Sequence, residues 1–202
     1  MKNERNGVRT WIEIDSAAIK HNMGVFRSSI SQKTKLMAVV KSNAYGHGLL
    51  DFSREVSRLG ADWLGVDSLI EGLALRKNGN KIPILVLGYT LPERLSEAAE
   101  NNISITISSM DNLEALLGSL APKSLKIHVK VDTGMHRQGF LVDQLEEFCE
   151  KIIKANKRGA RIVIEGLYTH FAAAKNPSFP QETTQQIELF ERAIVVTLVV
   201  GW

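Results

Sequence analysis

Short runs of apolar, often β-branched residues alternate along the chain with longer stretches in which apolar residues recur at helical spacing. This alternation predicts βα units packed around a parallel sheet. The predicted strands are Leu36–Lys41, Trp63–Asp67, Ile84–Leu87, Ile103–Ile107, Ile127–Asp132 and Ile162–His170. The predicted helices between them are Leu50–Leu59, Leu69–Lys77, Pro92–Asn101, Met110–Leu120 and Val142–Ala155.

The spacing of these elements favours a (β/α) barrel over a doubly wound sheet. Consecutive strands begin about 20 to 35 residues apart, and six βα units are counted against the eight of a closed barrel. Gly60, Gly79 and Gly159 fall where helices should end. No glycine-rich dinucleotide-binding fingerprint follows any strand. We therefore expect an α/β fold of the (β/α)8 TIM-barrel type, incomplete, with about six βα units.

The two ends of the chain depart from this pattern. Thr10–Asp15 alternates apolar and polar residues and predicts an extra strand, followed by a helix over Ala17–Ser29. After Arg192 the helix that starts near Gln181 gives way to an apolar tail, in which a seventh strand at Val195–Val200 is conceivable. The expected organisation is an N-terminal strand and helix (1–34), a partial barrel (35–193) and an apolar tail (194–202).

Composition indicates a compartment and excludes some partners. Of the 202 residues, 44% are apolar and 23% charged, which is ordinary for a globular domain, and a net charge of +3 does not favour nucleic acid. The one cysteine, Cys149, cannot form an internal disulfide and lies in a helical stretch, which predicts a buried, unreactive thiol in a reducing compartment. We see no secretory signal and no apolar run of the roughly 20 residues that a membrane span needs, so we expect a cytoplasmic protein with no membrane partner.

The segment from Ala38 to Gly48 carries the most distinctive chemistry. Its apolar run delivers one lysine, Lys41, at the end of a buried strand, and Tyr45 follows four residues later in a loop that contains glycines. Partial desolvation lowers the pKa of a lysine and makes the neutral amine available for Schiff-base chemistry. Taken alone, a lysine at a strand end is more commonly a solvated charge at the rim of a sheet, and the whole segment through Gly48 favours the Schiff-base lysine.

The end of the fifth predicted strand places Arg137 in a loop between two glycines, Gly134 and Gly139. Taken alone, an arginine in this position is more commonly a surface ion-pair residue, but a guanidinium can also bind a carboxylate or phenolate oxygen with its forked donors. Lys130 precedes this loop on the strand, where its charge would be buried inside a barrel.

The sixth predicted strand ends at His170, which could stack on an aromatic cofactor, act as a base or simply cap the strand. The remaining histidines considered, His21, His47 and His128, do not stand at the spacings of metal ligands, so no metal site is expected.

Four motifs together resemble the alanine racemase family of fold-type III pyridoxal-phosphate enzymes. They are the lysine loop through Gly48, the strand ending in Leu87-Gly88-Tyr89, the Asp-Thr-Gly-Met-x-Arg-x-Gly segment around Arg137, and Gly-Leu-x-Thr-His-Phe-Ala around His170. The resemblance implies that Lys41 is catalytic and bears pyridoxal 5'-phosphate. It further implies that the cofactor is contacted by Tyr45, Leu87, Arg137 and His170, and the substrate by Arg137 and Met135. In some members of the family the lysine that matches Lys130 is carbamylated.

The implied activity is the interconversion of L- and D-alanine, which supplies D-alanine for peptidoglycan, in a cytoplasmic homodimer. The family adds two more barrel units and a C-terminal β domain that supplies a second base, a tyrosine, and this chain does not extend to them. We therefore expect a truncated, inactive or incomplete form. The alternatives left open are a non-catalytic barrel fragment that binds pyridoxal phosphate and a racemase for serine or for a broad range of amino acids.

Overall fold

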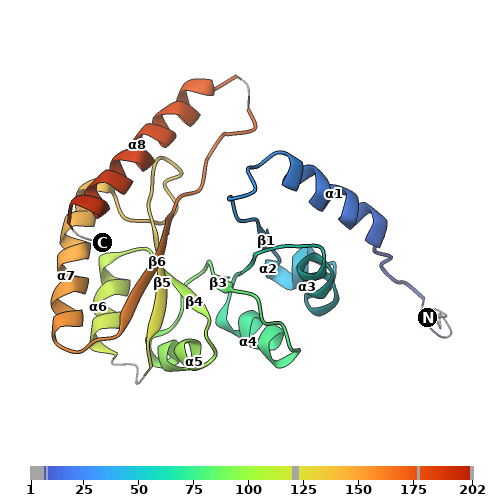
Figure 1. Ribbon diagram of the computed structural model, residues 1–202, viewed down its shortest axis with the longest axis horizontal. Coiled ribbons are helices and arrows are strands. Elements are labelled where there is room, and N and C mark those ends of the chain that lie inside the picture. The colour runs from blue at the N-terminus through green and yellow to red at the C-terminus, as the bar shows by residue number, and fades with distance from the viewer. Residues whose placement is uncertain (1–6, 8, 120–122, 177, 201–202) are drawn as a thin grey trace.

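Six parallel strands form one sheet in the computed structural model, which describes residues 7, 9–119, 123–176 and 178–200. The strands pair in chain order, β1 to β6, and every pairing is parallel (Figure 1). They are β1 (Met37–Val39), β2 (Trp63–Val66), β3 (Ile84–Val86), β4 (Ser104–Ile107), β5 (Leu125–Lys130) and β6 (Ile162–Tyr168).

A helical segment follows each strand, which gives six βα units. The helices are α1 (Ser16–Ser28), α2 (Lys41–Tyr45), α3 (Leu49–Arg58), α4 (Leu69–Lys77), α5 (Leu95–Glu100), α6 (Met110–Gly118), α7 (Leu145–Lys157) and α8 (Pro180–Val199). Two short 3₁₀ segments, η1 (Pro92–Arg94) and η2 (Val142–Gln144), lead into α5 and α7. In Figure 1, α3 to α7 form an arc around the strands.

The core lies between this arc of helices and the sheet. Ile84, Leu85 and Val86 of β3 are all buried, as are Leu64, Gly65 and Val66 of β2. Continuous apolar strands of this kind are typical of a parallel sheet that is covered on its faces. All six predicted strands and all five predicted intervening helices are confirmed to within a few residues, except that Leu120 lies outside the described residues.

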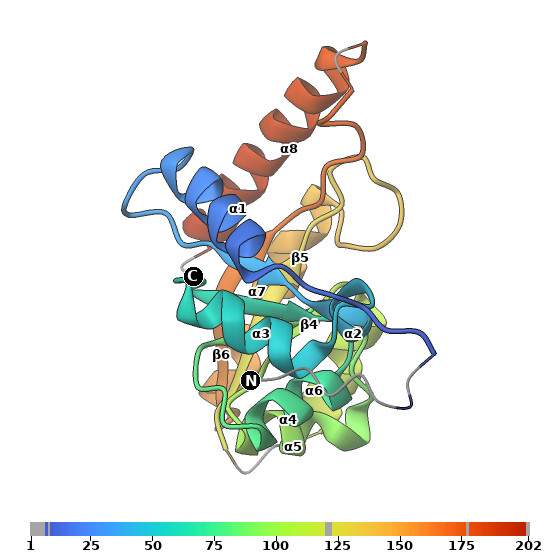
Figure 2. The same ribbon diagram turned by 90° about the vertical axis from the view of Figure 1, so that its right-hand side faces the viewer.

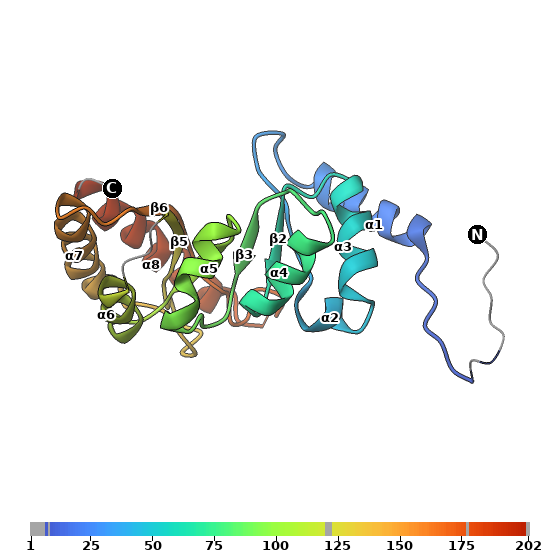
Figure 3. The same ribbon diagram turned by 90° about the horizontal axis from the view of Figure 1, so that it is seen from below.

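The prediction of a strand at Thr10–Asp15 is wrong. These residues have no strand pairing and run as an extended segment away from the sheet before α1 (Figure 3). Trp11 and Ile12 are 50% and 71% exposed, because no strand of the described chain lies beside them to complete the ladder. Asp15 instead caps α1, its carboxylate accepting a hydrogen bond from Ala17 N at 2.8 Å.

The conceivable seventh strand at Val195–Val200 is not formed either, since α8 continues without a break to Val199. Residue 193, the expected end of the barrel, falls within this helix, and residues 201 and 202 of the expected tail lie outside the described residues. Both α8 and α1 lie in the upper part of Figures 1 and 2, but Figure 3 shows them separated along the long axis of the molecule. The uniform apolar run is compatible with helix because α8 buries Ala193 and Thr197 on one side, next to α7.

Side chains tie α1 to the sheet. Arg27 donates to Gly60 O at 2.7 Å, to Thr34 O at 3.1 Å and to the Asp62 carboxylate, which also accepts from Leu36 N at 2.7 Å. The hydrogen bond from Arg27, followed by that from Leu36, lowers the pKa of Asp62. This network links α1 to the segments that enter β1 and β2.

Three further expectations from composition can be compared with the fold. Cys149 lies in α7 with 2% of its surface exposed, which confirms the expected burial, and burial raises the pKa of its thiol. Among the described residues no three His, Cys, Asp or Glu side chains come together as metal ligands would. No helix in the described ranges, α8 included, has the length and hydropathy of a membrane span.

Candidate active site at the carboxyl ends of the strands

The first strand leads Lys41 into a left-handed turn. β1 ends at Val39, and Lys41 opens α2 two residues later with its side chain 34% exposed. The next four residues, Ser42 to Tyr45, have φ angles of 54°, 55°, 53° and 54°. This conformation costs a non-glycine residue about 1–2 kcal/mol. Four such residues in succession are a strained segment of the kind that functional sites retain.

Lys41 faces the end of the neighbouring strand. Asp67 follows β2 directly, and its Oδ1 lies 3.5 Å from Lys41 Nζ. Asp67 is 57% exposed, and a long, open ion pair of this kind is weak. The Lys41 side chain therefore lies at the strand ends without a strong ion pair that would fix its position.

The loop after β5 is closed on itself by a parallel bridge between Val131 and Phe140. Asp132 N donates to Phe140 O at 2.9 Å, and Phe140 N donates to Lys130 O at 2.9 Å. Residues 132–139 thus leave the strand and return to it.

This loop presents Arg137 and Met135 at the edge of the sheet. Arg137 is exposed and Met135 is half-buried. The return requires Gly139, whose φ is 132° and at which a Cβ atom would lie 2.4 Å from Asp132 N. Asp132 Oδ1 braces the loop by accepting hydrogen bonds from two of its backbone amides.

Lys130 is the last residue of β5 and is only 2% exposed. Desolvation lowers the pKa of Lys130; Asp132 opposes this shift and Arg137 adds to it. Lys130 Nζ donates to Val131 O at 3.3 Å and lies 5.4 Å from the centroid of the Tyr168 ring. The burial that its strand position predicts is confirmed.

The sixth strand ends in Tyr168, with His170 two residues beyond. The Tyr168 hydroxyl lies 2.9 Å from Thr106 Oγ1, and Thr106 donates to Val86 O at 2.7 Å. Burial raises the pKa of Tyr168. The phenol is therefore fixed, neutral, across β4 and β6, while His170 is exposed at the sheet edge.

Positive charges converge on His170. Its pKa is lowered by partial desolvation and then by the charges of Arg137, Lys130 and Lys41. These cations come from the ends of two strands and the loop between β5 and β6. No carboxylate pairs with Arg137 in the part of the chain that the structure describes. The edge thus offers a neutral imidazole among cations, an arrangement that suits an anionic aromatic ligand.

Gln186 of α8 connects the two loops that carry Arg137 and His170. It is 3% exposed; its Nε2 donates to Thr133 Oγ1 at 3.2 Å and to His170 O at 3.4 Å, and its Oε1 accepts from Ala172 N at 2.9 Å. A buried amide with all its groups engaged fixes both loops to the same helix.

Two other predicted site residues stand at the same edge without direct contact to Lys41. Tyr45, on the left-handed turn, is 61% exposed. Leu87 follows β3, and its carbonyl accepts a hydrogen bond from Gln138 Nε2 at 3.4 Å, which links this strand end to the arginine loop. The structure therefore brings Lys41, Lys130, Arg137 and His170 together electrostatically and leaves Tyr45 open to solvent.

Asp67 and Tyr168 are the neighbours that sequence reasoning missed. Asp67 could have been found by asking which polar residue ends each predicted strand, because parallel strands bring those residues to one edge. Tyr168 could have been found as a polar residue close to the predicted strand end at His170. Asp67 ends the second predicted strand, and Tyr168 lies within the quoted histidine motif.

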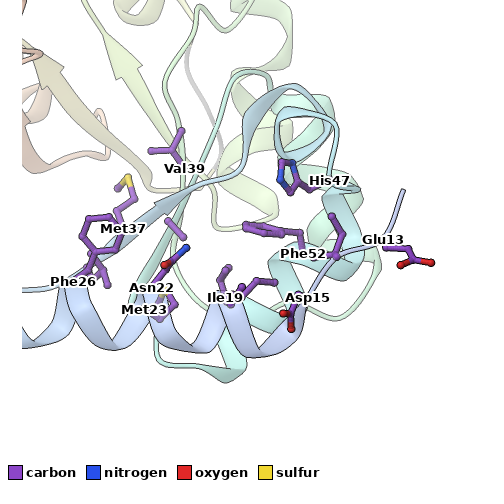
Figure 4. Close-up of a pocket in the computed structure, with 15 residues that line it drawn as sticks. Glu13, Asp15, Ile19, Asn22, Met23, Phe26, Met37, Val39, His47 and Phe52 are labelled. Carbon is purple, nitrogen blue, oxygen red and sulfur yellow. The ribbon is translucent and has the colours of Figure 1, made fainter. Parts of the chain in front are cut away.

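An apolar groove of about 560 Å³ lies elsewhere, between α1 and β1 (Figure 4). Phe26 and Met23 of α1 line it together with Met37 and Val39 of β1 and Phe52 of α3. None of the residues predicted to bind a cofactor lines this groove. The candidate site at the strand ends is therefore separate from this groove.

Comparison with known proteins identifies the family. The profile described as "Alanine racemase, N-terminal domain" matches residues 14–197. The chain belongs to the alanine racemase family. It is 38% identical over 187 residues to alanine racemase 2 of Oceanobacillus iheyensis, covering 92% of this chain and 46% of that one. The α/β fold is that of the family's TIM-barrel domain, represented here by six βα units.

Solved racemase structures resemble the chain closely. Alanine racemase from Bacillus anthracis, solved with bound L-Ala-P, superposes with a TM-score of 0.86 at 30% identity, over 95% of this chain and 49% of that one. Histidine racemase from Leuconostoc mesenteroides subsp. sake superposes with a TM-score of 0.80 at 31% identity, over 88% and 47%. The chain spans about half the length of the relatives that it matches.

Proposed function

We propose that the protein is a pyridoxal-phosphate-dependent alanine racemase and that this chain provides the lysine and the ring-facing residues of its cofactor site. The observation that carries the proposal is the position of Lys41, Lys130, Arg137 and His170 at the carboxyl ends of strands in one parallel sheet, where the three cations lower the pKa of His170. Membership of the alanine racemase family supports the reaction and its isomerase class.

The residues present fit the cofactor. Lys41 supplies an amine at the edge of the sheet, within reach of solvent and of a weak partner. Arg137, which pairs with no carboxylate in the described ranges, offers forked donors to a ring oxygen or to a substrate carboxylate. His170, whose pKa is lowered, is neutral near pH 7 and can lie flat on an aromatic ring. Tyr45, Leu87 and Met135 would line the pocket around these groups.

When bound, pyridoxal phosphate delocalises the charge that remains after an amino acid loses its α-proton. We infer that Lys41 Nζ takes this proton from one face of the substrate and returns it. Arg137 orients the substrate carboxylate and, by its fixed charge, stabilises negative charge near it.

We also propose that Lys130 is a site of carbamylation. Its lowered pKa increases the fraction of neutral amine, whose lone pair can add to carbon dioxide with loss of one proton. The anion formed would lie near the guanidinium of Arg137, whose charge already acts on Lys130.

Substrate choice has a second candidate. The similarity to a histidine racemase, at nearly the same identity as the similarity to alanine racemases, favours a shared proton-transfer site with different substrate pockets. Serine and other small amino acids are included in this alternative, and a barrel that binds the cofactor without turnover is the other. The homodimer, the cytoplasmic location and the role in peptidoglycan supply belong to the same proposal as alanine racemisation.

Exchange of the α-hydrogen of the amino acid for deuterium tests the proposed function. The chain is incubated in D₂O with pyridoxal phosphate and L-alanine, and incorporation is followed by mass spectrometry, with L-histidine and L-serine in parallel. We expect alanine to exchange faster than the other two, and at least about 10²-fold faster than with the Lys41→Ala variant, because the proton-transfer group is lost. Equal exchange with wild type and Lys41→Ala would contradict the proposal.

A further inference from the structure

Glu71 lies between the segments that follow β1 and β2, which carry Lys41 and Asp67. It lies in the first turn of α4, whose N-cap is Ser68. The sequence Ser68-x-x-Glu71 has the form of a capping box, in which the glutamate would turn back to the backbone of its own cap.

The observed contacts of Glu71 reach further than a cap. Its Oε2 accepts from Asp67 N at 2.9 Å, one residue before the N-cap, and its Oε1 accepts from Asn43 N at 3.1 Å. Asn43 is 28 residues away in the chain and belongs to the left-handed turn after Lys41. One carboxylate therefore uses both oxygens to hold the ends of β1 and β2.

The left-handed turn needs such external support. Asn43 already supplies internal support, since its Oδ1 accepts from Leu49 N at 2.8 Å and its carbonyl accepts from Gly48 N at 3.0 Å. Its own amide points outward to Glu71, in the middle of four residues with positive φ. Strained backbone persists where surrounding contacts fix it. The hydrogen bond from Asn43 N to Glu71 is such a contact, and it comes from a different element, α4.

The same carboxylate also fixes the partner of Lys41. Asp67 is held through its backbone by Glu71, and its side chain faces Lys41 Nζ at 3.5 Å. Lys41 is thus held from two sides: by the turn that follows it and by the carboxylate that it faces.

We propose that Glu71 is the positioning residue of Lys41, joining the lysine's turn and the Asp67 strand end through one carboxylate. Its consequence for cofactor capture rests on the proposed function, whereas the connection between the two strand ends does not.

Amide hydrogen exchange of Asn43 and Asp67 tests the connection in the 202-residue chain. In Glu71→Gln only one oxygen remains as an acceptor, and the new NH₂ group faces an N–H donor. We expect at least one of the two amides to exchange about tenfold faster or more, with the amides of β4 unchanged. Glu146→Gln is the matched control, since it makes the same charge change in the first turn of α7 at an exposed position; it should leave both amides unchanged.

Glu71→Asp is the second variant, because it keeps the charge and withdraws the carboxylate by one methylene. It should give the same selective loss of protection, and it replaces Glu71→Gln if that variant loses protection in β4 as well. Unchanged exchange at both Asn43 and Asp67 would overturn the inference.

The rate at which borohydride fixes pyridoxal phosphate on Lys41 gives the functional readout. We expect it to fall about tenfold in Glu71→Gln, in step with the loss of a charged hydrogen bond, and to remain at the wild-type rate in Glu146→Gln. Absence of capture by the wild type would count against the proposed function alone, whereas wild-type capture with a normal rate in both Glu71 variants would overturn the positioning role.

Discussion

At the scale of single residues, the two lysines of the site differ because of where each leaves its strand. Lys41 lies beyond the end of β1, with a third of its side chain exposed and a weak partner in Asp67. Lys130 is still within β5 and is almost fully buried, against the ring of Tyr168. The exposed amine of Lys41 is accessible to a ligand. The amine of Lys130 is buried and has a lowered pKa, so its effect is on the charges of neighbouring side chains.

The burial of Lys130 predicts a pH-dependent stability. Because its pKa in the folded chain is lowered, the unfolded chain binds more protons between that pKa and the ordinary value near 10.5, and the free energy of unfolding rises with pH in this window. The stability of Lys130→Met, which has no titrating group there, should lack this increment. The free energy of unfolding of the variant, taken relative to that of wild type, should therefore be highest near pH 7 and should decrease towards pH 10.

Urea unfolding of both proteins in buffers free of carbon dioxide measures this difference. Lys154→Met, at an exposed position of α7, is the control and should show no such trend. A constant difference between wild type and Lys130→Met from pH 7 to 10 would contradict the assigned pKa direction.

The residues of the site could be selected from the sequence because chemistry in a parallel sheet collects at the strand ends. Lys41, Arg137 and His170 are candidates on this ground, and the resemblance to the family assigns their roles and adds Tyr45, Leu87 and Met135; these roles stay predictions. The left-handed turn could not be predicted, because Ser42, Ala44 and Tyr45 disfavour positive φ and only Asn43 among the four adopts it readily. Glu71 could not be connected to Asn43 either, since that contact depends on how two βα units pack.

At the scale of elements, periodicity identified the strands and helices of the sheet and failed for residues 11–15, which do not pair with any strand of the described chain. Trp11 to Asp15 alternates like a strand, but a strand is stabilised only by its neighbours. The apolar residues after Arg192 resemble a strand in composition, yet they extend α8, since packing against α7 overrides β-propensity. The helix α1, which lies outside the βα series, is fixed by polar contacts as well as by packing.

The connection between α1 and the sheet gives a prediction at this scale. Arg27→Ala removes donors to the Asp62 carboxylate and to the carbonyls of Gly60 and Thr34. We expect the free energy of unfolding to fall by about 1 kcal/mol, since the pair is about one-third exposed, and amide exchange in α1 to accelerate. Arg54→Ala, which removes an exposed pair with Asp51, should change neither.

Acid should have the same effect as this variant. The pKa of Asp62 is lowered, so its contribution is present above the ordinary value near 3.8 and is lost as the pH falls through the lower value of the folded chain. Undisturbed exchange in α1 of Arg27→Ala would show that packing alone holds the helix.

At the scale of the whole molecule, six parallel strands in chain order place every strand end at one edge, so residues separated by more than a hundred positions share one electrostatic environment. The order of the strands was expected from the regular alternation of strand and helix, because right-handed βα connections place successive strands side by side. The pairing of charged side chains at that edge could not be expected from the sequence. Asp132 accepts hydrogen bonds from the amides of its own loop, and Arg137 pairs with no carboxylate among the described residues.

The central claim is that Lys41, and not the buried Lys130, is the amine that takes up pyridoxal phosphate. Borohydride reduction of the chain with the cofactor, followed by peptide mass mapping, measures this directly, with Lys130→Met and Lys41→Met as a matched pair. We predict one pyridoxyl group, on Lys41, which persists in Lys130→Met and disappears in Lys41→Met. A label that maps to Lys130, or that survives in Lys41→Met at the wild-type level, would contradict the assignment of the site.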